Sequence, residues 1–431
     1  MSFLAEHSRS LLVCASLLGA AGFVACSSSS GGGAQPVDSG GVDGGRDTEP
    51  PGEDTAPPEC TAPINKGPWV VAVEETKALV RWEACVPGAS GLSLTPEAGG
   101  ATTKVASKAT PFVVSDTIEV PLLGDADYAG TFYTHEVALT GLSPSTCYTY
   151  ALDADETVKG RLCTARDPGA SFSFMALGDT NPGLGVTNAM VTKAYAQKPD
   201  FTVHAGDIQY YASGLETWTS WMKLMAPMLR GGAFFPAIGN HENERPTEKK
   251  DYFDRFWGGA GFDGTNEYYR FHSGGVWFFA LDTEMDVSAS SEQGSWLQSQ
   301  LLDAQGKPGF RFSVVFFHRP WATCGDVSNK PDVRAAYTPI FEKTGVQLVI
   351  QGHMHGYERF ELGKLTYVTA AGGGGALGNV DANKDNPECV DRKASGNFFH
   401  TVFFEVSKGQ LKGTATDDHG VVRDTFTKVV P

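Results

Sequence analysis

Five short polar motifs stand out because each follows an apolar run and is rich in residue types that bind metal ions. They are Gly178-Asp179-Thr180-Asn181, Gly206-Asp207-Ile208-Gln209-Tyr210, Gly239-Asn240-His241-Glu242, Phe317-His318-Arg319 and Gly352-His353-Met354-His355. Carboxylates can bridge two cations, neutral imidazoles are the commonest nitrogen ligands, and an asparagine oxygen ligates without charge. Two ions about 3.5–4 Å apart can stabilise both the attacking and the leaving oxygen of an in-line displacement. The residue types therefore predict a pair of metal ions.

Taken singly, most of these motifs have an ordinary structural explanation. A Gly-Asp pair after a strand is often a turn or a helix N-cap, and His318 alone could be a partly buried histidine with a satisfied hydrogen bond. The Gly-His-x-His motif is stronger, because two histidines one residue apart at a strand end suit chelation. All five in this order argue against chance. His204 lies inside an apolar run, and we expect it to pack behind Asp207.

The elements that must position these motifs alternate between strand and helix, which is typical of a layered α/β fold. Helices are predicted over Val186–Gln197 and Leu215–Leu229. Strand ends at one edge of a sheet converge, and the glycines let the backbone turn sharply there. The predicted strands are Ser171–Leu177, Asp200–Ala205, Ala233–Ile238, Val276–Leu281, Phe312–Phe317, Val346–Gln351 and three closing antiparallel strands, Phe398–Val406, Gln410–Asp417 and Val421–Val429.

An all-β segment precedes this α/β part, over residues 63–167. Short β-rich runs such as Trp69–Val73 and Ala78–Trp82 are joined by polar turns. The spacing Leu142-x-Pro144-x-Thr146-x-Tyr148 resembles the entry to the sixth strand of a fibronectin type III domain, where a tyrosine bonds a nearby backbone group. No catalytic set is visible in this segment. It is therefore interpreted as a spacer or a rim for the substrate, with an independent binding module as the alternative.

The ordered motifs resemble those of the calcineurin-like metallophosphoesterase superfamily and, more narrowly, those of the purple acid phosphatases. Most members of the superfamily carry Asp-x-His in the first motif, whereas Asn181 stands at the histidine position here and Tyr210 is present in the second motif. This pair of changes is typical of purple acid phosphatases. The resemblance covers about residues 172–375. It implies a two-sheet αββα sandwich as the catalytic domain over 168–431, preceded by the fibronectin III-like sandwich.

The resemblance also implies a role for each motif residue. Asp179, Tyr210 and His355 would hold the first ion, Fe(III), and Asp207 would bridge both ions. The second ion, which could be iron, zinc or manganese, would be held by Asn240, His318 and His353. A metal-bound hydroxide would then attack the phosphorus of a small phosphorylated substrate, as in an acid phosphatase acting on monoesters. The alternatives are a phosphodiesterase or nucleotidase on the same scaffold, or a non-catalytic cell-surface protein.

One departure from the family concerns the proton donor. Plant-type members carry further histidines shortly after the lone histidine, but no histidine lies between His318 and His353. His241 is therefore the remaining candidate catalytic residue, for phosphate contact or proton donation. Arg319 could bind phosphate instead, or it could be a structural surface arginine.

The N-terminus reads as an export signal. An apolar run from Leu11 to Ala25 has the length of a signal-peptide core and is too short for a membrane span. Because Phe23-Val24-Ala25-Cys26 resembles a bacterial lipobox, residues 1–26 are predicted to be a lipoprotein signal with Cys26 as the lipid acceptor. Ordinary secretion is the alternative. Residues 27–62 are Ser-, Gly-, Pro- and acid-rich, and are predicted to be a flexible tether.

The net charge limits the possible binding partners, and the cysteine content predicts disulfides. The formal net charge of −16 argues against nucleic acid as a partner, so the membrane is expected to be contacted through the lipid anchor alone. An even number of cysteines in an exported chain favours disulfides, and none has CxxC spacing. Neighbourhood in the chain favours the pairs Cys60–Cys85, Cys147–Cys163 and Cys324–Cys389.

Overall fold

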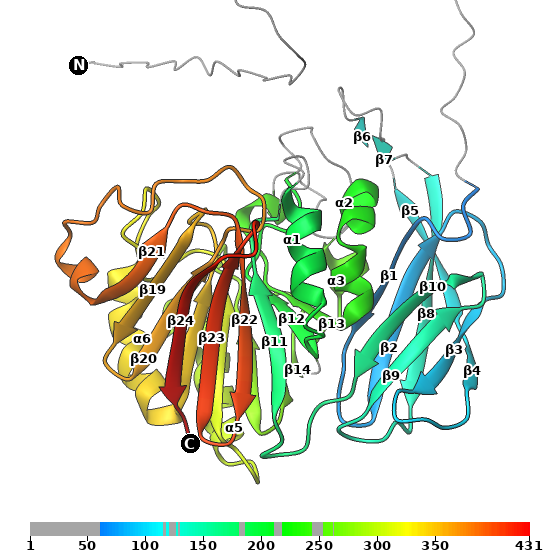
Figure 1. The fold of residues 1–431 in the computed structure, drawn as a ribbon, viewed down its shortest axis with the longest axis horizontal. Helices are drawn as coiled ribbons and strands as arrows, with labels where there is room; N and C mark the ends of the chain where they lie inside the picture. The colour runs from blue at the N-terminus through cyan, green and yellow to red at the C-terminus, as the bar shows by residue number, and fades with distance from the viewer. Residues whose placement is uncertain are drawn as a thin grey trace, which may run out of the picture. The chain divides into compact units, whose positions relative to one another are not determined.

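Two large β-sheets form the framework of the protein (Figure 1). The first has ten strands, in the spatial order β24 (Val422–Val429), β23 (Gln410–Asp417), β22 (His400–Ser407), β11 (Phe172–Leu177), β12 (Phe201–His204), β13 (Ala233–Pro236), β1 (Lys66–Val71), β2 (Lys77–Ala84), β8 (Gly130–Thr140) and β5 (Lys108–Val114). The second has eight, in the order β14 (Asp263–Gly264), β15 (Tyr269–Ser273), β16 (Val276–Ala280), β17 (Phe312–Phe317), β18 (Val346–Gln351), β20 (Leu365–Ala370), β19 (Tyr357–Leu362) and β21 (Arg392–Gly396).

This computed structural model describes residues 61–431 except 115–117, 120–125, 128–129, 181–185, 211–217, 244–252 and 262. The described residues all lie within one compact unit, Ala56–Pro431. The predicted signal, its lipid acceptor Cys26, most of the predicted tether and Cys60 lie outside the described residues, as does Asn181. Among the described residues, no helix is both long and apolar enough to cross a membrane.

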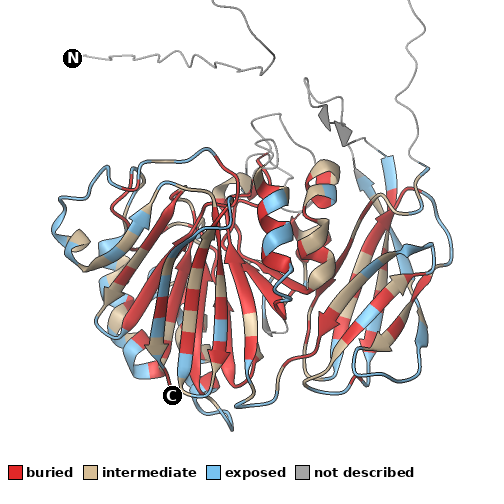
Figure 2. Ribbon diagram, in the orientation of Figure 1, coloured by how far each residue is buried: buried red, intermediate tan, exposed pale blue. Residues whose placement is uncertain are grey.

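Continuous apolar strands explain why the two sheets stack on each other. Strand β17 reads FSVVFF and is buried along its whole length, as a strand covered on both faces must be. The face of β17 that carries Phe316 packs in the core shared with the first sheet. The opposite face, which carries Phe317, packs in a second core under the helices α5 (Glu292–Gln305) and α6 (Pro331–Thr344). Between the sheets, Phe174 of β11 meets Phe278 of β16 edge to face at 5.2 Å. In the first sheet, Figure 2 shows the central strands β11 and β12 as largely buried.

Helices cover the outer faces, so the α/β part has the predicted order of helix, sheet, sheet and helix. The first sheet is covered by α1 (Val186–Tyr195), α2 (Trp218–Leu224) and α3 (Ala226–Gly231). The single helix predicted over Leu215–Leu229 is wrong, because the described part of this stretch forms two helices with Met225 between them. Pro227 lies in the first turn of α3, where a backbone N–H would have no partner within the helix in any case. Because proline cannot donate that hydrogen bond, α2 does not continue through it.

The all-β segment contributes to three sheets, one of which is the small pair β6 (Ile118–Glu119) and β7 (Ala126–Asp127). Strands β1, β2, β8 and β5 extend the first sheet, whereas β10 (Asp155–Cys163), β9 (Cys147–Leu152), β3 (Gly91–Pro96) and β4 (Thr103–Ala106) form a separate one. The hydroxyl of Tyr148 accepts a hydrogen bond of 2.9 Å from the backbone N–H of Ser143, as the tyrosine motif predicted. Strand β1 pairs in parallel with β13 at Val70 and Ala233, so the first sheet runs across the predicted domain boundary near residue 167. That boundary remains a prediction.

Two predicted disulfides are confirmed. Cys147 and Cys163 face each other across the β9–β10 pair and are bonded. Cys324 and Cys389 are also bonded, and they lie 65 positions apart in the chain. Cys85 is disulfide-bonded too, but its predicted partner Cys60 lies outside the described residues.

Candidate metal centre

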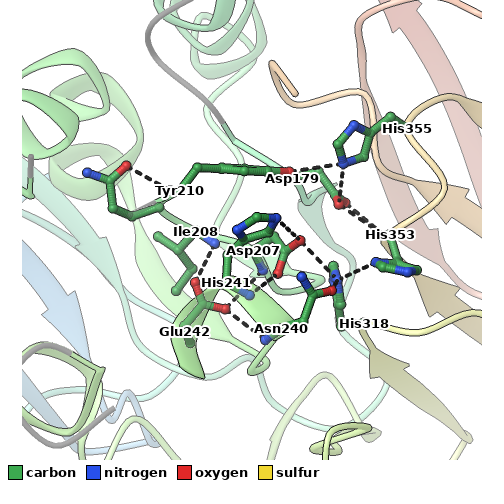
Figure 3. Close-up of polar contacts among 12 residues, drawn as sticks. Asp179, Asp207, Ile208, Tyr210, Asn240, His241, Glu242, His318, His353 and His355 are labelled. Atoms are coloured by element: carbon green, nitrogen blue, oxygen red, sulfur yellow. Dashed lines mark hydrogen bonds and ion pairs between the residues drawn. The ribbon is translucent and has the colours of Figure 1, made fainter. Parts of the chain in front are cut away.

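All five motifs lie at the C-terminal ends of parallel strands and come together at one place (Figure 3). The expectation that a single sheet edge gathers them is wrong. Asp179, Asp207 and Asn240 follow β11, β12 and β13 of the first sheet, whereas His318 and His353 follow β17 and β18 of the second. Because the two sheets are stacked with these ends adjacent, the site lies between them.

The first group of ligand-type atoms surrounds the imidazole of His318. Its Nε2 lies 3.1 Å from Asp207 Oδ2, 3.1 Å from Asn240 Oδ1 and 3.0 Å from His353 Nδ1. Its Nδ1 lies 2.9 Å from the carbonyl oxygen of Ala205. A carbonyl can only accept, so Nδ1 carries a hydrogen. When the ring is neutral, the lone pair of Nε2 therefore faces the other ligand-type atoms.

The second group is built in the same way around His355. Its Nε2 lies 3.0 Å from the Tyr210 hydroxyl and 3.2 Å from Asp179 Oδ1. Its Nδ1 donates to the carbonyl oxygen of Ala376 at 2.7 Å. Asp179 is held in place by the backbone N–H of His353, which lies 3.1 and 3.0 Å from its two carboxylate oxygens.

Asp207 belongs to both groups. The trio Asp207, His318 and His353 and the trio Asp179, Asp207 and His355 each bring their ligand atoms within 4.8 Å of one another. Oδ2 of Asp207 is buried and accepts no well-formed hydrogen bond from the described residues. In both groups, lone pairs of oxygen and nitrogen atoms face each other with no hydrogen between them, and they repel unless a positive charge lies among them. The two groups therefore suit the binding of cations.

The electrostatics show the same demand for positive charge. Burial lowers the pKa of His318, but the carboxylates of Asp207 and Asp179 outweigh it and raise that pKa to about 10. Burial is likewise outweighed for His355, whose pKa is raised to about 9 chiefly by Asp179. The pKa of Asp207 is lowered, because His318 and His241 overcome the cost of its burial. Protons on these two imidazoles and bound metal ions are thus alternative ways of balancing the carboxylates.

The backbone of the site is held in an unusual conformation. Asp179, Asp207 and His353 have φ angles of 59°, 50° and 67°, in the left-handed region that residues other than glycine rarely adopt. The prediction that the motif glycines make the sharp turns is therefore only partly right. A Cβ atom on Gly239 would lie 2.2 Å from Asp207 Oδ1, so this glycine is needed for close approach. Strain gathered at these positions indicates a functional site.

Part of the chain is similar to a known protein family. Residues 172–357 match the model of the calcineurin-like phosphoesterase family. The chain contains a calcineurin-like phosphoesterase domain. Purple acid phosphatase 22 of Arabidopsis thaliana is 28% identical over 243 residues, which are 53% of this chain and 54% of that protein. The chain thus spans about half the length of this curated relative.

Two solved structures share the fold of the phosphoesterase domain and of much of the chain around it. The purple acid phosphatase PPD1 of yellow lupin (Lupinus luteus) has a TM-score of 0.68 at 19% identity, covering 86% of this chain and 74% of its own. PhoD has a TM-score of 0.60 at 12% identity, covering 87% of this chain and 90% of its own. At these identities the likeness concerns the fold alone.

The remaining predicted site residue of the phosphoesterase domain, His241, lies at the rim of the centre. Its backbone N–H donates to Asp207 Oδ1 at 2.9 Å, and its ring packs on that of Tyr210 with 4.0 Å between the ring centroids. The side chain keeps 25% of its surface exposed. His204 is fully buried behind the centre as expected, where its Nε2 lies 3.0 Å from the hydroxyl of Thr180.

Sequence reasoning missed the role of Glu242. Its buried carboxylate accepts hydrogen bonds from three backbone N–H groups, those of Gly239 at 2.7 Å, Asp207 at 3.0 Å and Ile208 at 2.7 Å. Burial and the charge of Asp207 raise the pKa of Glu242 to about 8. Its place in the Gly-Asn-His-Glu motif was a signal, but only the fold reveals that it ties the Asp207 loop to the Asn240 loop.

Proposed function

We propose that this chain hydrolyses phosphate esters with two metal ions, as an acid phosphatase of the purple acid phosphatase type. The observation that carries the proposal is the position of Asp207, which belongs to two ligand groups at once. A carboxylate shared in this way suits a bridge between two cations. The phosphoesterase domain and the similarity to Arabidopsis thaliana purple acid phosphatase 22 support the reaction class.

The proposed ligands follow from the two groups. Asp179, Tyr210 and His355 hold one ion, and Asn240, His318 and His353 hold the other. We assign Fe(III) to the first position, because a phenolate oxygen from Tyr210 is a hard anionic ligand, and iron, zinc or manganese to the second. When bound, such ions act as Lewis acids and lower the pKa of water.

The chain's own residues hold the reacting groups in place. The carbonyl oxygens of Ala205 and Ala376 fix the tautomers of His318 and His355, so that each presents a lone pair to the centre. His241 is the proposed proton donor to the leaving group or contact to phosphate, because its partly exposed ring stands beside Asp207 and Tyr210. The proposed substrates are small phosphate monoesters.

Metal analysis combined with kinetics tests this proposal. Protein purified without chelator should contain two transition-metal ions per chain, one of them iron, and should hydrolyse an aryl phosphate monoester faster than the corresponding diester. Removing the metals should abolish the activity, and adding iron with zinc or manganese should restore it. A preparation with a single calcium or magnesium ion and no iron would contradict the assignment. Faster hydrolysis of the diester would favour a phosphodiesterase.

We further propose that the protein is exported and anchored by a lipid on Cys26, with the fibronectin III-like segment as a spacer. The lipobox-like sequence supports this, and the disulfides are compatible with an oxidising compartment. Intact cells should then release the protein only with detergent, and Cys26→Ser should shift it to a soluble or unprocessed form. Wild-type protein that is already fully soluble would refute the anchor.

A further inference from the structure

Arg319 directly follows the ligand-type residue His318, and its side chain is fixed at the rim of the centre. Nε of Arg319 donates to Glu284 Oε1 at 2.7 Å and Nη2 donates to Oε2 at 2.8 Å, which is a two-point pair between planar groups. The backbone N–H of Arg319 also donates to the hydroxyl of Thr283 at 2.8 Å. The guanidinium is therefore oriented, and 34% of the side chain remains exposed.

The third nitrogen of this guanidinium points at the centre itself. Nη1 of Arg319 lies 3.2 Å from Nε2 of His353. An arginine can only donate, so Nε2 must be the acceptor and the hydrogen of a neutral His353 ring then lies on Nδ1. Nδ1, however, is the atom that faces Nε2 of His318 at 3.0 Å within the first ligand group.

Metal binding is incompatible with this contact. A cation held on Nδ1 of His353 leaves the ring hydrogen on Nε2, so two N–H donors would face each other across 3.2 Å. The Nη1 group of Arg319 must then turn to another acceptor. Glu284 already occupies the opposite edge of the guanidinium, and no other partner of Nη1 is described in the resolved ranges of the chain.

We propose that Arg319, freed from His353 when the metals bind, holds an oxygen of the substrate's phosphoryl group. A phosphate oxygen has the charge and the geometry that an oriented guanidinium prefers. Arg319 is thus a phosphate-binding residue whose availability depends on metal loading. This inference rests on the proposed function and adds to it the group that recognises the phosphoryl end of the substrate.

Calorimetric titration with inorganic phosphate tests the inference without measuring activity. In the metal-loaded full-length protein, Arg319→Gln should weaken phosphate binding about tenfold or more. Arg319→Lys should recover part of the affinity, because it keeps the charge but loses the planar fork. The metal-to-protein ratio should be the same in all three proteins. In metal-free protein, the wild type and Arg319→Gln should bind phosphate equally weakly.

A matched control is Arg161→Gln, which breaks another arginine–glutamate pair, with Glu97 at 3.1 Å, in the all-β segment. It should leave phosphate affinity unchanged. Arg319→Gln with full metal content and wild-type phosphate affinity would overturn the inference while leaving the proposed function intact. Loss of metal from Arg319→Gln would also overturn the inference, because it would show that Arg319 serves to hold His353 in place. Wild-type protein that binds no metal would overturn both proposals. If Arg319→Gln does not fold, the test rests on Arg319→Lys. Wild-type phosphate affinity in that variant would overturn the inference.

Discussion

Tyr210 is the residue that would distinguish the proposed purple-type centre from that of the wider calcineurin-like group. Its hydroxyl lies 3.0 Å from Nε2 of His355, in the group that also contains Asp179, and the residue is only 6% exposed. A phenol ionises near pH 10 in water, and an adjacent ferric ion would hold it as the phenolate at neutral pH. In the proposed centre, Tyr210 would therefore set both the choice of metal and the colour of the protein.

Replacing Tyr210 with phenylalanine tests this assignment at the level of one atom. Tyr210→Phe keeps the ring and its packing on His241, so the fold should survive. The visible charge-transfer band should vanish and iron should be lost more readily on dialysis, while some hydrolysis persists because Asp207 and the second group remain. Absorption spectra and iron analysis provide the measurement. A folded variant with its full visible band would show that Tyr210 is not a ligand.

At the scale of elements, the centre depends on loops from two sheets being held in register. Glu242 ties the loop after β12 to the loop after β13, because one carboxylate accepts from the N–H groups of Asp207, Ile208 and Gly239. These loops carry Asp207 in its left-handed conformation and also Asn240. A buried acid that makes these bonds supports an otherwise strained backbone.

Glu242→Gln should weaken metal binding by about 10- to 100-fold, as is typical when a residue that orients ligands is lost. One carboxylate oxygen becomes an NH₂ group, which would face backbone N–H donors. Competition with a chelator, followed by metal analysis, measures the effect. Glu358→Gln is the control, because Glu358 is also buried and accepts from the backbone N–H of Cys324 at 2.8 Å. The control should reduce stability without changing metal affinity. Equal metal affinity in Glu242→Gln and the wild type would refute the supporting role.

At the scale of the whole folded unit, the all-β segment and the phosphoesterase domain share more than a sheet. Glu83 of β2 is fully buried and pairs with Lys66 of β1 at 2.8 Å and with Arg255 of the short helix α4 (Arg255–Trp257). Lys66 and Arg255 outweigh the cost of burial and lower the pKa of Glu83. Its stabilising effect is therefore present above the usual glutamate pKa and is lost as the pH falls below it.

Glu83→Gln should destabilise the folded chain by about 3–5 kcal/mol, because two buried cations lose their counter-charge. Thermal unfolding at neutral pH measures this, and we expect a single transition that shifts to lower temperature. Glu405→Gln is the control. It breaks the exposed pair with Lys412, whose side chains are 51% and 44% exposed, and it should cost less than about 1 kcal/mol. A second, unshifted transition in Glu83→Gln would show that the two parts unfold independently.

The local features of this protein were determined by its sequence. Strands β17 and β18 begin and end at the predicted residues, because short runs rich in apolar side chains and bounded by glycine or polar residues leave little choice. The placement of the motifs directly after these strands is likewise local. The disulfide Cys147–Cys163 was predictable because its cysteines flank one hairpin.

Long-range partners were decided only by the tertiary structure. Apolar periodicity shows that a strand is buried but not which sheet covers it, so the division of the motifs between two sheets was not predictable. The same holds for the pairing of β1 with β13 and for the contacts of Arg319 with Glu284, 35 residues earlier in the chain, and with His353. A side chain's hydrogen-bond partner depends on how distant loops meet, and no local pattern in the sequence encodes that meeting.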